Sequence, residues 1–143
     1  MKLEVKFEVQ IIPHAEQRYE TCGDWWRDDN GVWQIRVSDL GNADMANLIA
    51  IHEINEILIA LAMMAEGADP QDLVEITDKF DQAYEILRPA TDTTSEPGYE
   101  PTCPVHRPHM IASAIEHLVA PELGVNYNEF GRRVGALDKN KVQ

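Results

Sequence analysis

The sequence predicts an α+β fold in which a small antiparallel sheet packs on three main helices. Two observations carry this expectation. Polar and apolar residues alternate along two stretches of the first 40 residues, which is typical of strands with one buried face. The stretch from Leu48 to Met64 is instead apolar on almost every side of a helix, which indicates a central helix that is fully buried.

The sheet is expected within residues 1–40, as an N-terminal strand followed by a hairpin. Strict alternation over residues 3–11 predicts the first strand. Asn30-Gly31 favours the tight turn of a hairpin, and alternation resumes over residues 33–37. The segment between these strands should cross the domain as a loop.

Helical patterns then follow over about residues 43–65, 70–88, 108–120 and 126–134. Pro70 and Pro108 suit the first positions of the second and third helices, because proline is favoured in a first turn. The third helix carries its apolar side chains at Met110, Ile111, Ala114, Ile115 and Leu118. Before it, residues 89–108 are rich in proline and predict a long loop that could act as a lid.

Residues 1–143 are expected to form a single domain. The net charge of −13 argues against a broad nucleic-acid-binding face and against attraction to an anionic membrane. Cys22 and Cys103 lie far apart, which predicts reduced thiols, and the N-terminal residues do not resemble a signal peptide. We therefore expect a cytoplasmic protein; its oligomeric state is not indicated.

The polar residues of the apolar helix point to a metal site. His52 and Glu56 are four residues apart, so both project from one helix face and can hold one ion between them. In the HExxH pattern, ligands at this spacing hold zinc and the intervening glutamate deprotonates the bound water. His52 and Glu56 are the predicted ligands here, with Glu53 as the base. Zn²⁺ is the expected cofactor, although another divalent metal would also suit these ligands.

A third ligand must come from elsewhere in the chain. His109 is the first choice, and His106 and Glu116 are alternatives or contacts of a ligand. Two other interpretations remain open. The same side chains could form a buried polar network that holds helices together. Glu53 and Glu56, with Glu75 and Asp78, also resemble the ExxE and ExxD carboxylates of all-α nucleotide pyrophosphohydrolases, which bind Mg²⁺.

The run VWQIRVSDL and the following IHEINEILIAL, within residues 32–65, resemble the minimal core of zincin-like metallopeptidases. In those proteins an edge strand beside the HExxH helix positions the peptide. The pattern departs from HExxH at Glu56, which replaces the second histidine. The resemblance implies a zinc-dependent hydrolase acting on a protein or peptide substrate.

Residues 1–130 also resemble a group of small uncharacterised phage and prophage proteins. The shared features are GDWW at Gly23–Trp26, IRVSD at Ile35–Asp39, HEINE at His52–Glu56, FDQAYE at Phe80–Glu85, EPG at Glu96–Gly98, and the spaced His109 and Glu116. This resemblance implies no activity. A second hypothesis is a non-catalytic phage accessory or interaction protein with a structural His/Glu cluster, whose interaction surface would include exposed aromatic side chains near Trp25–Trp26.

Overall fold

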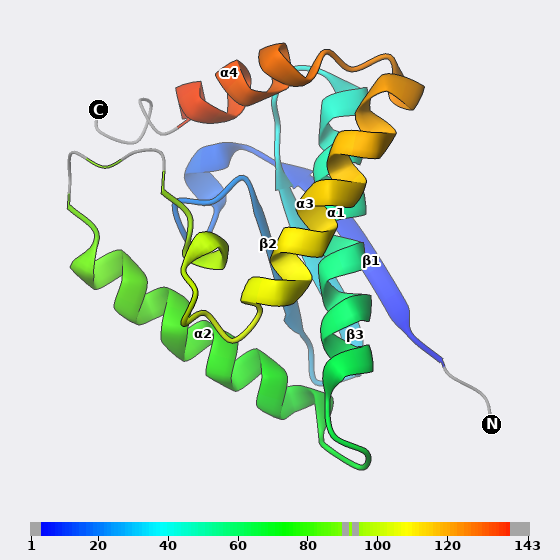
Figure 1. The fold of residues 1–143 in the computed structure, drawn as a ribbon, viewed down its shortest axis with the longest axis vertical. Coiled ribbons are helices and arrows are strands. Elements are labelled where there is room, and N and C mark those ends of the chain that lie inside the picture. Colours follow the sequence, from blue (N-terminus) through cyan, green and yellow to red (C-terminus); the bar gives the residue numbers. More distant parts are fainter. Residues whose placement is uncertain (1–3, 90–91, 93–94, 138–143) are drawn as a thin grey trace.

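The computed structural model describes residues 4–89, 92 and 95–137; parts of the predicted sheet region and of the predicted loop, residues 1–3, 90–91 and 93–94, lie outside these ranges. The predicted α+β class is confirmed: within the described residues, a three-stranded sheet packs against helices (Figure 1). The strands are β1 (Lys6–Ile12), β2 (Gly23–Arg27) and β3 (Val32–Ser38).

The sheet is mixed, so the prediction of an antiparallel sheet is wrong for β1. The strand order is β1-β3-β2, with β2 antiparallel to β3 and β1 parallel to it. The hairpin was predicted correctly, and Gly31 adopts the positive φ of 77° that its turn needs. Because β3 inserts between the first two strands, the chain returns beside β1 in the same direction.

Helix α1 (Ala43–Met63) begins at Asn42, whose side chain accepts a hydrogen bond from the backbone N–H of Met45. It packs on β3 and α3, but only one face is buried: Leu58 and Met63 are exposed. The prediction of a fully buried helix is therefore wrong. By length and composition α1 could cross a membrane, but half of its most apolar window is buried within the fold, as in the core helix of a globular domain.

The remaining helices are α2 (Pro70–Leu87), α3 (His106–Val119) and α4 (Tyr127–Leu137), with short 3₁₀ helices η1 (His14–Glu16), η2 (Pro97–Tyr99) and η3 (Ala120–Leu123). Helix α3 begins two residues before the predicted Pro108. The predicted long loop is not entirely irregular, because it contains η2.

Helix α3 turns its polar residues inward. His109, Ala112 and Glu116 are buried against α1, while Met110 and Leu118 are 44% and 76% exposed. His109 and Glu116 are seven residues apart and therefore share a face, and the small Ala112 between them leaves room for α1. The packing thus brings a second set of imidazole and carboxylate groups onto the polar face of α1.

Candidate metal centre

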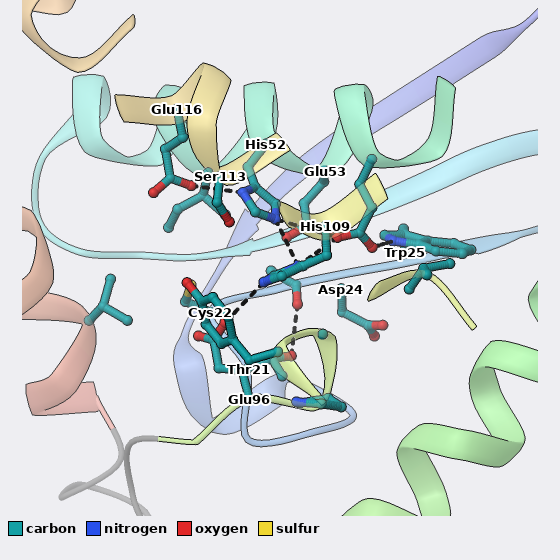
Figure 2. Close-up of a pocket in the computed structure, with 18 of the residues that line it drawn as sticks. Thr21, Cys22, Asp24, Trp25, His52, Glu53, Glu96, His109, Ser113 and Glu116 are labelled. Atoms are coloured by element: carbon teal, nitrogen blue, oxygen red, sulfur yellow. Dashed lines mark hydrogen bonds and ion pairs between the residues drawn. The ribbon is translucent and has the colours of Figure 1, made fainter. Parts of the chain in front are cut away.

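Three side chains from α1 and α3 converge inside the fold. Glu56 Oε2 lies 3.4 Å from His52 Nε2 and 2.7 Å from His109 Nδ1, and the two ring nitrogens are 3.2 Å apart. All three residues are buried, and they form a group able to hold a metal ion. The helical spacing brings His52 and Glu56 together, and the contact between α1 and α3 adds His109. Figure 2 shows the rings of His52 and His109 next to each other.

Both oxygens of Glu56 are engaged. Its Oε1 accepts a hydrogen bond of 2.9 Å from the indole N–H of Trp25 on β2, which leaves Oε2 directed at the two imidazoles. Trp25 is only 6% exposed, so the sequence-based expectation of an exposed aromatic surface at this residue is wrong. The tryptophan instead ties the sheet to the candidate metal ligand.

His52 is held from its other side by Glu116. The Nδ1 of His52 lies 2.9 Å from Glu116 Oε2, and the hydroxyl of Tyr127 donates a 2.5 Å hydrogen bond to Glu116 Oε1. A carboxylate behind a metal-binding histidine fixes the ring and leaves the opposite nitrogen for the metal. Glu116 therefore has the position of an orienting group rather than that of a fourth ligand.

The segment containing η2 covers His109. A Cβ on Gly98 would lie 2.5 Å from His109 Cγ, so only glycine allows this approach. The ring of Tyr99 meets His109 edge-on at 4.8 Å between centroids, and Glu96 Oε2 lies 4.0 Å from His109 Nε2. His106 does not join the ligands; its Nδ1–H donates to the Gly98 carbonyl at 3.0 Å and so braces this segment.

Glu53 lies beside the ligand group without belonging to it. The residue is 8% exposed, and a Cβ on Gly23 would lie only 2.0 Å from its Oε1. Burial raises the pKa of Glu53 well above its usual value; His52 opposes this rise, and the charge of Glu56 adds to it. A carboxylate whose pKa is raised is a stronger proton acceptor than an ordinary one.

The charges of the ligand group compensate one another. Burial alone would lower the pKa of His52, but its hydrogen bonds to Glu116 and Glu56 outweigh that effect and raise the pKa to about 11. Burial alone would raise the pKa of Glu56, but its hydrogen bonds to His109 and His52 lower it to about 2. A metal ion at this position would take the place of the protons between these groups.

The ligand group lines a cavity of about 220 Å³. Carboxylates dominate its charged lining, which consists of Asp24, Glu53, Glu56, Asp81, Glu96 and Glu116 together with the imidazoles of His52 and His109. Among the described residues that line the cavity, none is lysine or arginine. Glu75 is exposed and Asp78 pairs with Arg18 at 3.4 Å, so these acids do not join Glu53 and Glu56 in the arrangement of the pyrophosphohydrolase hypothesis.

The structure therefore brings His52, Glu53, Glu56, His109 and Glu116 together as the sequence suggested, and assigns His106 to the covering segment. Sequence reasoning missed the parts played by Trp25 and Tyr127, and also Asp81. The GDWW and EPG motifs were signals for the contacts of Trp25 and Gly98. Comparisons with protein-family models, curated proteins and solved structures give no match.

Proposed function

We propose that the protein is a metal-dependent hydrolase in which His52, Glu56 and His109 hold a zinc ion. The observation that carries this proposal is the convergence of two imidazole nitrogens and one carboxylate oxygen within 3.4 Å of one another. Two nitrogens and an oxygen are a ligand set that occurs in catalytic zinc sites.

The donor atoms fit the size of zinc. Ligands about 2.0–2.1 Å from a tetrahedral zinc ion are about 3.3 Å apart. The separations of 3.4 Å between Glu56 Oε2 and His52 Nε2 and of 3.2 Å between the two ring nitrogens match this value. Only the 2.7 Å separation between His109 Nδ1 and Glu56 Oε2 would have to increase. The contacts of Trp25 and Glu116 would orient the ligands from behind.

Three protein ligands favour catalysis over a purely structural site, because they leave a coordination position for water or substrate. When bound, zinc lowers the pKa of water and polarises a carbonyl group. Glu53 would accept the proton from the attacking water, and its position against Gly23 fixes the carboxylate beside the ligand group. A peptide substrate is favoured by the resemblance of residues 32–65 to zincin-like metallopeptidases.

One observation favours a second candidate function, a non-catalytic protein with a structural His/Glu cluster. The contact between His109 Nδ1 and Glu56 Oε2 is already a short hydrogen bond, and His52 and His109 are also within hydrogen-bond distance. This network joins α1 to α3 without any ion. The same residues then serve folding rather than chemistry.

Metal analysis combined with one substitution separates these candidates. We expect the purified full chain to carry about one zinc per molecule and to cleave members of a library of internally quenched peptides. Glu53→Gln should retain the zinc and lose cleavage by about 10²-fold or more, because a general base is removed and the ligands are kept. Glu75→Gln, which removes an exposed acid from α2, is the matched control and should change neither.

Zinc-free protein whose thermal stability is unaffected by a chelator would overturn the proposal and support the structural cluster. Bound zinc with undiminished cleavage in Glu53→Gln would remove Glu53 as the base. Bound zinc without cleavage of any peptide would refute the hydrolase proposal and leave only a metal-binding protein.

A further inference from the structure

The end of the cavity formed by α2 contains polar groups that the proposed chemistry does not use. Thr77 and Asp81 are four residues apart on α2, so they share one face, and both line the cavity. Thr77 is 6% exposed, and its hydroxyl oxygen has no hydrogen-bond partner within the described part of the chain. A buried hydroxyl without a partner costs free energy unless a ligand or water satisfies it.

Asp81 has no counter-ion. No hydrogen bond or ion pair reaches its carboxylate from residues 4–89, 92 and 95–137. The nearby cation, Arg18, is already committed to Asp24 through contacts of 2.6 Å and 2.9 Å, and to Asp78. Burial and the charges of neighbouring carboxylates raise the pKa of Asp81 to about 7, although Arg18 opposes this rise.

We propose that the α2 end of the cavity is a subsite for a cationic group of the substrate, an ammonium or guanidinium, held by the carboxylate of Asp81 and the hydroxyl of Thr77. A cation supplies what this end lacks: a positive charge for Asp81 and a donor for the free hydroxyl oxygen of Thr77. The absence of lysine and arginine from the described lining makes the cavity unsuitable for a phosphate or carboxylate group.

The subsite and the metal centre belong to one cavity. Its volume of about 220 Å³ equals that of about seven liquid water molecules, enough for a compact side chain. The assignment of the bound cation to a substrate rests on the proposed function. It predicts that hydrolysis takes place next to a basic group. Binding of the cation itself needs no metal, which allows the two proposals to be tested separately.

The test uses n-butylguanidinium and its neutral counterpart n-butylurea, titrated into the full chain by calorimetry in chelator at about pH 8, where Asp81 is ionised. We expect n-butylguanidinium to bind and n-butylurea to bind at least about tenfold more weakly, the effect of losing a charge-assisted hydrogen bond. Asp81→Asn should weaken binding of the cation to a similar extent, and Thr77→Val to a smaller one. Glu75→Gln removes an exposed charge of the same helix and should leave the affinity unchanged.

No binding of n-butylguanidinium, equal binding of the two probes, or full binding by Asp81→Asn would each overturn the subsite. The comparison of the two probes on the unaltered chain holds even if a variant fails to fold. Cleavage of matched peptides that contain either arginine or its neutral counterpart citrulline separates the subsite proposal from the hydrolase proposal. Binding of the cation without any cleavage refutes the hydrolase alone, while cleavage that does not distinguish arginine from citrulline refutes the subsite alone.

Discussion

The two ends of the cavity use similar side chains in opposite ways. At the α1–α3 end, Glu56 and Glu116 each engage both carboxylate oxygens, and their partners come from different elements of the fold. At the α2 end, Thr77 has no partner for its hydroxyl and the Asp81 carboxylate forms no ion pair among the described residues. The first end is organised before any ligand arrives, whereas the second depends on what enters the cavity.

This difference separates two effects of substitution. A change at the α1–α3 end should lower stability as well as metal binding, since the contacts there also hold α1, α3, α4 and the sheet together. A change at the α2 end should raise stability and lower ligand binding, because uncompensated polar groups are costly in the folded state.

Gly98→Ala should have the largest effect, because its Cβ would lie 2.5 Å from Cγ of the buried His109 ring. We expect a loss of about 3 kcal/mol in the free energy of unfolding, at the upper end for overpacking, together with loss of the metal. Denaturant unfolding and metal analysis measure the two effects. Gly135→Ala, which meets no atom within 4 Å, should not destabilise the fold. A stable, metal-loaded Gly98→Ala would show that η2 does not position His109.

Trp25→Phe should cost about 2 kcal/mol of unfolding free energy, because Glu56 Oε1 loses its buried N–H donor. Metal affinity should fall by about 10- to 100-fold, as expected when a group that orients a ligand is removed. The control is Trp26→Phe on the same strand, whose ring contacts the guanidinium groups of Arg18 and Arg36. Equal losses in the two variants would mean that indole packing, and not the hydrogen bond, explains the result.

The site was predictable where spacing alone determines geometry. His52 and Glu56 share a face of any helix, and the isolated polar groups on an apolar stretch marked that face. His109 and Glu116 share a face for the same reason, but the sequence did not show which face of α3 is buried. The apolar Met110 and Leu118 suggested that the face opposite His109 and Glu116 is buried. Amphipathic patterning assumes that apolar faces are buried, and it cannot show that the polar faces of two helices pack together and form hydrogen bonds with each other.

The rest of the fold depends on contacts between distant segments. Alternation predicted β1 as a strand but contains no information on its direction, which follows from its pairing with β3. The hydrogen bond from Trp25 to Glu56 joins residues 31 positions apart; the GDWW motif marked Trp25, but no local pattern identifies its partner. Asp81 was one of many acids on α2, and only its place in the cavity lining distinguishes it from the others.

Asp81→Asn should stabilise the protein in a pH-dependent way. Burial raises the pKa of Asp81 from 3.8 to about 7, so the folded state keeps a proton that the unfolded state loses between these values. Stability of the parent chain therefore falls as the pH rises from about 4 to about 7. The variant should gain about 1–2 kcal/mol above about pH 7, after allowance for solvent screening, and little below about pH 4. Unfolding measured across this range tests the sign; a destabilised variant at neutral pH would contradict it.

Tyr127→Phe should have the smallest effect, a loss of about 1 kcal/mol, because it removes one hydrogen bond to Glu116 from α4 and leaves the ring in place. A double-mutant cycle with Glu116→Gln isolates this contact, and we expect the two losses to be less than additive. Burial, together with the hydrogen bond and charge of Glu116, also raises the pKa of Tyr127, so Glu116→Gln should lower that pKa in a spectroscopic titration. Additive losses with an unchanged tyrosine pKa would mean that α4 does not support His52 through Glu116, and the organised end of the cavity would then consist of α1, α3 and β2 alone.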